Sequence, residues 1–227
     1  MKRKAAERAV ELIEDGMRLG LGTGSTARHV LQVVAERRAR GELRDIRGVP
    51  TSLATRELAR ELNIPMTTLD QLPELDLAID GADEVDPDLN LIKGLGGSLL
   101  WEKIVESAAE RLVIVVDEGK LVERLGDRAP VPVEVVQFAW QTHLRFFEEL
   151  GAQPRLRETP KGDPLVTDSG NFIIDCAFED GLSDPWRLEV ELKHRPGIVE
   201  SGLFLDMAQT VVVAAADGVK TLERDES

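Results

Sequence analysis

Long apolar runs, cysteine pairs and an excess of positive charge are all missing from this 227-residue sequence. No apolar stretch reaches the roughly 18 residues that a membrane span needs. The single cysteine, Cys176, excludes a disulfide within the chain and is expected to be a small buried residue. The formal net charge of −14 argues against general binding to nucleic acid or anionic membrane, because both require a positive face.

Several catalytic signatures are missing as well. There is no tyrosine and there are few other aromatic residues, so platforms for base stacking are not expected. His29, His143 and His194 have no partner at metal-ligand spacing, so we predict no metal centre and expect surface or packing histidines. No Gly-x-Ser-x-Gly motif occurs, which argues against acyl transfer by a serine triad.

The composition that is present predicts a folded protein. Hydrophobic residues make up 42% of the chain and charged residues 31%, which is enough for a sizeable core. The N-terminal residues 1–16 lack the apolar region of a signal peptide and predict an amphipathic helix, with Ala6, Val10 and Ile13 on one face. We therefore expect a soluble, cytoplasmic protein.

Helix and strand signals alternate in the first half of the chain, as is typical of a parallel sheet covered on both faces. The clearest strand is the continuous β-branched run at 112–116, which indicates burial on both sides. Further strands are expected at 17–21, 46–49, 75–79 and 89–92, with helices at 26–40, from the turn at 51–52 to about 63, and from about 99 to 110.

The pattern changes near residue 128. An alternating segment at 130–136 carries prolines, which favours an edge strand. A helix at 138–150, short strands at 153–156, 165–167 and 172–175, and a helix at 185–193 follow, before a buried strand returns at 210–216. We therefore predict an α/β fold in which 1–127 and 202–227 form a mostly parallel sheet domain and 128–201 an inserted α+β subdomain.

Four polar loops follow predicted strands of the α/β part, where the carboxyl ends of parallel strands meet at one crevice. The first, GLGTGST at 20–26, predicts binding of a phosphate by backbone N–H groups and a helix N-terminus. Ser25 stands where a dinucleotide fingerprint needs its third glycine, and no acid follows the next strand. A Walker sequence is also absent, so a single phosphate fits better than a pyrophosphate.

The other three loops carry charged residues. DGADEVD at 80–86 crowds four carboxylates, which suits proton transfer but also fits a metal site or a solvated turn. KGLGGS at 93–98 places Lys93 where a cation can neutralise an oxyanion, and Glu102 follows about one turn into a helix. Without other evidence, Glu102 could equally complement the helix N-terminus. Lys120 follows the strongest strand and is either a phosphate ligand or an exposed turn lysine.

Five segments together resemble the ribose-5-phosphate isomerase A family in one order along nearly the whole chain. They are GLGTGSTA at 20–27, PTSLAT at 50–55, AIDGADEVD at 78–86, IKGLGGSLLWEKI at 92–104 and GIVESGLFL at 197–205. The resemblance implies a Rossmann-like domain with an inserted ferredoxin-like subdomain. It also implies interconversion of D-ribose 5-phosphate and D-ribulose 5-phosphate in the pentose phosphate pathway, without metal or other cofactor, in a homodimer or homotetramer.

The resemblance also implies roles for single residues. Glu102 would be the proton acceptor for a cis-enediolate route, with Lys93 meeting the oxyanion and Asp80 and Asp83 moving protons and assisting ring opening. Gly119 stands where the family often has Ser or Thr before the lysine. The substrate contacts carried over are Thr23, Gly24, Ser25, Thr26, Asp80, Gly81, Ala82, Asp83, Lys93, Gly94, Leu95, Gly96 and Lys120.

Three alternatives come from related folds. A sugar-phosphate sensor of a transcription regulator would have no need for a positioned lysine and glutamate. An acyl-CoA transferase would use a nucleophilic glutamate in a different motif, and an amino-sugar-phosphate deaminase would favour a catalytic histidine. Neither context is found in the sequence.

Overall fold

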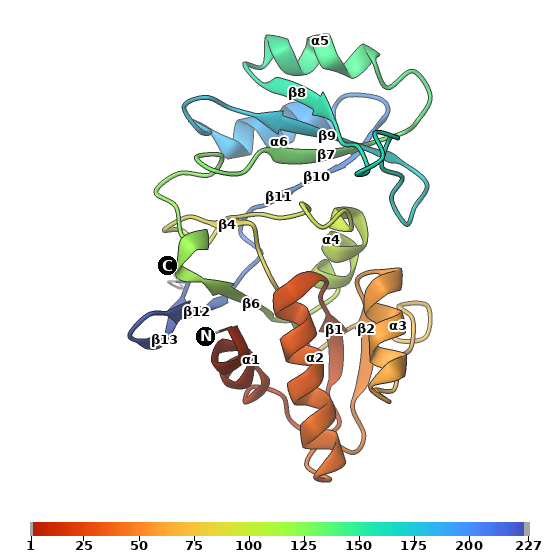
Figure 1. Cartoon of the computed structure of the whole chain (residues 1–227), viewed down its shortest axis with the longest axis vertical. Helices are drawn as coiled ribbons and strands as arrows, with labels where there is room; N and C mark the ends of the chain where they lie inside the picture. The colour runs from red at the N-terminus through yellow and green to blue at the C-terminus, as the bar shows by residue number, and fades with distance from the viewer. Residues whose placement is uncertain (1, 225–227) are drawn as a thin grey trace. The chain divides into compact units, whose positions relative to one another are not determined.

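The computed structural model describes residues 2–224 and contains a six-stranded main sheet (Figure 1). The strand order is β13-β12-β6-β3-β1-β2, and all neighbours are parallel except β12 and β13. The strands are β1 (Arg18–Leu21), β2 (Arg47–Pro50), β3 (Leu77–Asp80), β6 (Leu112–Asp117), β12 (Thr210–Ala215) and β13 (Gly218–Glu223). The α/β fold with a mostly parallel sheet is therefore confirmed, whereas β13 was not predicted.

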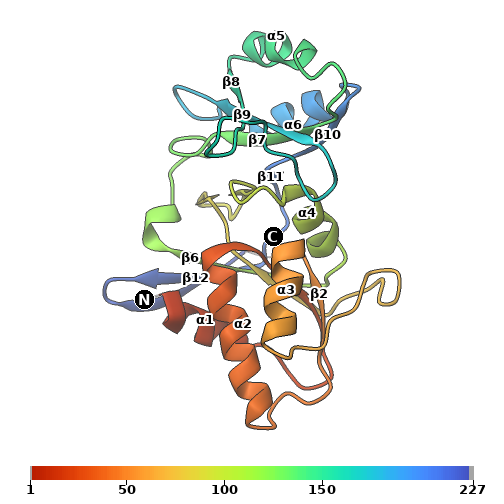
Figure 2. The ribbon, with the colours of Figure 1, turned by 45° about the vertical axis from the view of Figure 1, so that its right-hand side comes forward.

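Helices cover both faces of the main sheet, as the alternating pattern predicted. Apolar residues of α1 (Lys2–Val10), α2 (Gly24–Ala39) and α3 (Leu53–Glu61) share one core with the sheet, and Figure 2 shows these helices side by side. A second cluster contains Val49, Leu75 and Val105, the last from α4 (Leu99–Ser107). Burial of apolar side chains from both faces explains why the central strands read as continuous hydrophobic runs.

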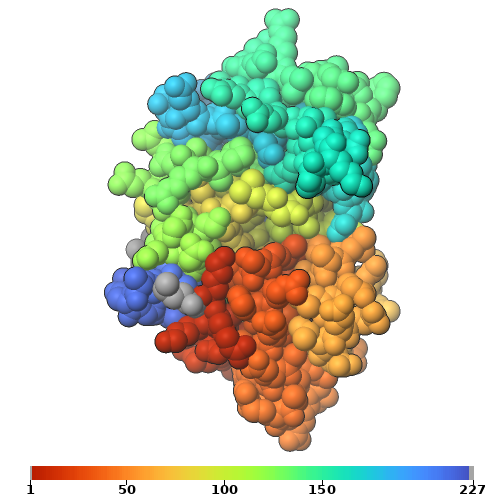
Figure 3. Space-filling view, in the orientation of Figure 1, coloured from red at the N-terminus to blue at the C-terminus, as the bar shows by residue number. Residues whose placement is uncertain are grey.

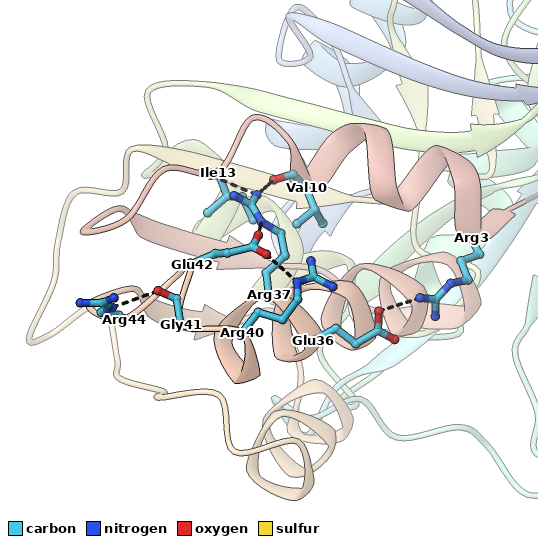
Figure 4. Close-up of polar contacts among 9 residues, drawn as sticks. All are labelled: Arg3, Val10, Ile13, Glu36, Arg37, Arg40, Gly41, Glu42 and Arg44. Carbon is cyan, nitrogen blue, oxygen red and sulfur yellow. Dashed lines mark hydrogen bonds and ion pairs between the residues drawn. The ribbon is translucent and has the colours of Figure 1, made fainter.

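Helix α1 is fastened to α2 by arginine side chains (Figure 4). Arg37 Nη1 donates to the carbonyl oxygens of Val10 at 2.6 Å and Ile13 at 3.3 Å, which lie at and just beyond the end of α1. Val10 is the last residue of α1, where carbonyl groups lack the N–H of a following helical turn. Arg3 pairs with Glu36 at 2.6 Å on the exposed surface, where the two helices lie next to each other (Figure 3).

Both edges of the main sheet differ from a plain open strand. Beyond β2, Gly48 donates its N–H to the carbonyl of Pro65 and accepts the N–H of Thr67, so a short parallel bridge covers this edge. At the other edge, β13 is mostly exposed and carries charged residues such as Lys220 and Glu223. Charged side chains on an edge strand discourage pairing with a further strand.

A four-stranded antiparallel sheet lies in the second part of the chain, in the order β10-β7-β9-β8. Helices α5 (Thr142–Glu149) and α6 (Pro185–Lys193) share a hydrophobic core with it. The strands are β7 (Val131–Val135), β8 (Gln153–Leu156), β9 (Phe172–Ala177) and β10 (Ile198–Ser201). The predicted α+β character of this region is confirmed.

A third, small antiparallel sheet has the order β11-β5-β4. It consists of β4 (Glu84–Val85), β5 (Leu91–Ile92) and β11 (Leu203–Phe204). The loop at 93–98 follows β5, so the prediction that all four polar loops follow strands of one parallel sheet was wrong. A two-residue strand contains too little sequence to reveal which sheet it joins.

The described residues form two compact units. One contains 2–82, 101–120 and 206–224, and the other contains 83–100 and 121–205. This grouping differs from the predicted division at 127/128 and 201/202, chiefly because 83–100 lies in the second unit. None of the helices in the described range is long and apolar enough to cross a membrane.

Three predicted elements need correction. Strand β7 is internal rather than an edge strand, since it lies between β10 and β9. Pro132 is tolerated there because the ladder with β10 ends at Ser201 opposite Val133, so the missing N–H of Pro132 lies beyond that ladder. Helix α5 starts after residue 138, because Ala139 has a left-handed φ of 54°. Residues 165–167 form no strand, since Thr167 and Asn171 close a turn instead.

Candidate functional site

Asp80, at the end of β3, is buried and fastens the loop that follows β1. Its Oδ1 accepts the backbone N–H of Thr23 at 2.9 Å and that of Gly81 at 2.7 Å. A Cβ at Gly22 would collide with this carboxylate, so only glycine fits there. The first glycine-rich loop and the first aspartate of the acidic loop are thus brought together, as expected for the carboxyl ends of parallel strands.

Four hydroxyl groups meet beside the same loop. Thr23 Oγ1 lies 2.7 Å from Thr51 Oγ1, 2.8 Å from Ser52 Oγ and 3.1 Å from Thr55 Oγ1. Thr55 Oγ1 also donates to the carbonyl of Gly22 at 2.8 Å. Thr51, Ser52 and Thr55 were not among the predicted site residues. The only sequence signal for them was their position in the PTSLAT segment, directly after a strand of the same sheet.

The remaining residues of this loop begin α2. Gly24, with φ 98°, and Ser25 are exposed, and Thr26 is half-buried. Their backbone N–H groups belong to the first helical turn, where the positive end of a helix dipole favours an anion. Lys2 Nζ lies 3.3 Å from Ser25 Oγ and 3.6 Å from Asp117 Oδ2, so a cation that was not predicted stands at this helix end.

The first unit contains three further predicted residues. Lys120 ends a short 3-10 helix, η1 (Glu118–Lys120), directly after β6 and is half-buried. Glu102 lies in the first turn of α4 and its residue is only 4% exposed. A carboxylate in this place is complemented by the helix N-terminus, so its position agrees with both the catalytic and the structural interpretation. Ala82 is half-buried at the end of the first segment of this unit.

The acidic loop separates into carboxylates with different partners. Glu84 is buried and accepts backbone N–H groups of Gly126, Arg128 and Ala129, each at 2.6 Å. Asp86 binds the backbone and side-chain amides of Asn90, and burial raises its pKa. Three oriented amides stabilise a buried negative charge, so Glu84 fixes the backbone of this region.

Asp83 holds the lysine–glycine loop within the second unit. Its Oδ2 accepts the N–H of Leu95 at 2.9 Å, and its own N–H donates to the carbonyl of Ile92 at 2.8 Å. Leu95 is 42% exposed, and it contributes its backbone N–H to this contact.

Lys93 is buried, with 2% of its surface exposed, although it is a lysine. Its Nζ lies 5.3 Å from the centroid of the Phe204 ring, a cation–π distance. Its backbone N–H donates to the carbonyl of Gly202 at 2.9 Å. A lysine is rarely buried for packing alone, so its ammonium group is a strong candidate for a functional charge.

The glycines after Lys93 allow a tight turn. Gly94 has φ 102° and a Cβ there would lie 2.7 Å from Leu99 Cβ, whereas Gly96 has open space around it. The guanidinium of Arg157 donates to the carbonyls of Gly94 at 2.7 Å and Leu95 at 3.1 Å. Arg157 is distant in sequence and carried no motif, so sequence reasoning missed it.

Comparisons with known proteins identify the family. The family model for ribose 5-phosphate isomerase A (phosphoriboisomerase A) matches residues 47–218. The chain is 53% identical over 222 residues to ribose-5-phosphate isomerase A of Roseiflexus castenholzii, covering 98% of this chain and 94% of the relative. It is 48% identical over 225 residues to the same enzyme of Pyrococcus abyssi, with 99% and 98% covered.

Solved structures of the same family are closely similar. A D-ribose-5-phosphate isomerase in complex with phospho-erythronic acid superposes with a TM-score of 0.95 at 47% identity, covering 98% of this chain and 97% of that one. The ribose 5-phosphate isomerase A of Methanocaldococcus jannaschii gives a TM-score of 0.93 at 42% identity, with the same coverage. The resemblance that five short segments suggested thus extends over the whole chain, which belongs to the ribose 5-phosphate isomerase A family and catalyses the isomerisation of ribose 5-phosphate.

Proposed function

We propose that isomerisation runs through a cis-enediolate, with Glu102 as the base that serves both carbons. The observation that supports this best is a buried carboxylate in the first turn of α4, close in sequence to a buried lysine, Lys93. A base held away from water takes a proton from carbon more readily than a solvated one.

The proton balance of the proposed step is simple. Glu102 removes the proton from carbon 2 of the open-chain aldose, and the electron pair forms the carbon 1–carbon 2 double bond of the enediolate. The same carboxyl group then returns the proton to carbon 1. The hydroxyl on carbon 2 loses its proton and becomes the ketone, while the oxygen on carbon 1 gains a proton and becomes a hydroxyl. The ammonium of Lys93 and the N–H of Gly96 meet the negative charge that develops on oxygen.

The other predicted residues would bind and open the sugar. We assign the phosphate to Thr23–Thr26 and Lys120, because the first turn of α2 presents backbone N–H groups and hydroxyls. Asp80 and Asp83 would move protons between the sugar oxygens and open the furanose ring. Binding energy from the distant phosphate would position the reacting carbons.

Isotope transfer tests the single-base route. Ribose 5-phosphate carrying deuterium on carbon 2 is converted in ordinary water, and the ribulose 5-phosphate is examined by mass spectrometry and proton NMR. One base shared by both carbons predicts that part of the deuterium appears on carbon 1 and the rest exchanges with solvent. Complete transfer without exchange would indicate a hydride shift and overturn the enediolate.

Glu102→Gln tests the identity of the base. We expect kcat to fall by about 10²–10⁴-fold while KM changes much less, because the amide keeps the shape but cannot accept the proton. Glu106→Gln is the matched control, since Glu106 is buried one turn later on the same helix. Near-normal turnover in Glu102→Gln, or an equal loss in both variants, would contradict the assignment.

The family resemblance also leads us to propose a place in the pentose phosphate pathway, a cytoplasmic location and a homodimer or homotetramer. Sedimentation of the purified chain would measure the oligomeric state. Formation of ribulose 5-phosphate in the presence of EDTA tests the proposal that no metal takes part. Activity that is lost on chelation and restored by metal would contradict it.

A further inference from the structure

Two carbonyl groups of the lysine–glycine loop accept hydrogen bonds from one side chain that is distant in sequence. Arg157 directly follows β8, and its Nη1 donates to the carbonyls of Gly94 at 2.7 Å and Leu95 at 3.1 Å. All three residues lie in the second unit, and the side chain of Arg157 is only 11% exposed. The loop's backbone is therefore held by a charged donor that is largely shielded from water.

The guanidinium is itself fixed in orientation. Arg157 Nε donates to Asp175 Oδ2 at 2.9 Å, and Nη2 pairs with Asp175 Oδ1, so two parallel bonds bind it to β9. A bidentate pair of this kind fixes the plane of the guanidinium as well as its position. The remaining nitrogen, Nη1, is thereby aimed at the two loop carbonyls. Lysine has no planar fork and could not make both sets of contacts.

The two carbonyls decide where the next N–H groups point. In a trans peptide the N–H lies opposite the C=O, so a carbonyl held by Arg157 turns the following N–H away from Arg157. The N–H after Gly94 belongs to Leu95 and donates to Asp83 at 2.9 Å. The N–H after Leu95 belongs to Gly96, around which a Cβ would find open space.

We infer that Arg157 is a positioning residue for catalysis: bound to Asp175, it fixes the Gly94 and Leu95 peptides and so aims the Gly96 N–H at the developing oxyanion. This inference rests on the proposed function, in which Lys93 and the Gly96 N–H stabilise the enediolate. A donor that is about 1 Å out of place loses much of its effect on the transition state but little of its effect on substrate binding.

The test compares steady-state kinetics of Arg157→Ala, Arg157→Lys and Asp175→Asn. We expect kcat to fall by about 10²-fold in both arginine variants, with KM changed by less than about threefold. Asp175→Asn breaks the ion pair but keeps an oxygen acceptor for the guanidinium, so its kcat is expected to fall far less. Arg155→Ala is the matched control, because Arg155 is an exposed arginine of β8, two residues before Arg157.

Rescue by added guanidinium distinguishes a positioning role of Arg157 from a general effect of the substitution on folding. Added guanidinium, at concentrations too low to unfold the protein, is expected to restore part of the kcat of Arg157→Ala and none of that of Arg155→Ala. Circular dichroism verifies that the variants are folded. If Arg157→Ala keeps kcat within about threefold of the wild type, or if Asp175→Asn loses as much as Arg157→Ala, the inference is wrong.

Lys93→Met distinguishes failure of the inference from failure of the proposed function. If Lys93→Met loses turnover while folded Arg157→Ala does not, the loop is catalytic but Arg157 does not position it. If Lys93→Met turns over normally, the proposed role of the loop is wrong, and the role of Arg157 is wrong with it.

Discussion

Asp80 Oδ1 accepts the backbone N–H of Thr23 at 2.9 Å, which joins the end of β3 to the loop after β1 through one side-chain oxygen. The glycine-rich loop thus already holds a carboxylate of the protein itself at the N–H of Thr23. A bound phosphate would therefore meet the next N–H groups, in the first turn of α2. The conformation of this loop depends on a residue that we also propose to move protons.

The two tasks of Asp80 can be separated by substitution. Asp80→Asn keeps an Oδ1 that can accept both N–H groups, whereas Asp80→Ala leaves two donors without it at a buried position. We expect Asp80→Ala to lower the free energy of unfolding by about 2–4 kcal/mol and Asp80→Asn by about 1 kcal/mol or less. Urea unfolding measures both. Equal stability of the two variants would show that the N–H contacts contribute little.

Kinetics give the other half of the Asp80 prediction. Asp80→Asn should be folded and nevertheless slow, because an amide cannot exchange protons with the sugar oxygens at a useful rate. A kcat for Asp80→Asn equal to that of the wild type would remove Asp80 from the catalytic group while leaving its structural contacts intact.

Phospho-erythronic acid, the ligand of one related structure, offers a probe of the oxyanion site. Its carboxylate resembles an enediolate in being planar and negatively charged. We expect Lys93→Met to weaken binding by about tenfold or more, because a charge-assisted hydrogen bond is lost. Glu102→Gln removes a like charge and is expected to bind at least as tightly as the wild type. Calorimetry that finds the two variants changed in the same direction would contradict these roles.

Because of the buried imidazole of His143, we expect the folded protein to lose stability in mild acid. Burial lowers the pKa of its imidazole, and the positive charge of Arg195, whose Nε donates to His143 Nδ1 at 3.0 Å, adds to this. The unfolded chain therefore binds a proton near its ordinary pKa of 6.5 more readily than the folded one. Stability from this group is present above pH 6.5 and is lost as the pH falls below it.

His143→Asn tests this pH dependence, because Oδ1 of asparagine can accept from Arg195 but does not bind a proton. We expect the free energy of unfolding of the variant to fall less than that of the wild type between about pH 6.5 and 5. His29→Gln is the control, since it removes an imidazole from the other unit. Parallel curves for wild type and His143→Asn would show that His143 is not the group responsible.

Cys176 reports on opening of the second unit. Its thiol is buried in the hydrophobic core beneath α5 and α6, and burial raises its pKa. The thiolate is the reactive form, so labelling by a thiol reagent should require local or global unfolding. We expect labelling at pH 8 to be slow in buffer and fast in denaturing urea. Rapid labelling of the folded protein would mean that this core opens readily.

Elements with a strong local pattern could be predicted from sequence. The run of Leu112–Asp117 is apolar along almost its whole length and forms β6, because both faces of a central parallel strand are covered. The two-residue strands β4 and β11 exist only through pairing with β5 and could not be read from local sequence. Pro132 led to the wrong prediction of an edge strand for a related reason. Whether a proline is tolerated inside a sheet depends on where the neighbouring strand ends.

The residues of the candidate site also divide into those that local sequence indicates and those that it does not. Glycines and charged residues at strand ends indicated Thr23, Asp80 and Lys93, because such residue types in such places suit anion binding and proton transfer. Arg157 could not be found this way, since its contacts with Gly94 and Leu95 join residues about 60 positions apart. A single arginine just after a short strand has no spacing pattern that indicates its partner.

The two edges of the main sheet also bear on how copies of the chain can associate. Gly48 is already paired with residues 65–67, and β13 presents charged side chains along a mostly exposed strand. The bridge at Gly48 and the charged side chains of β13 both oppose the alignment of a strand from a second molecule. Assembly by fusing main sheets into one continuous sheet is therefore disfavoured, and so is the edge-to-edge aggregation that threatens open parallel sheets during refolding.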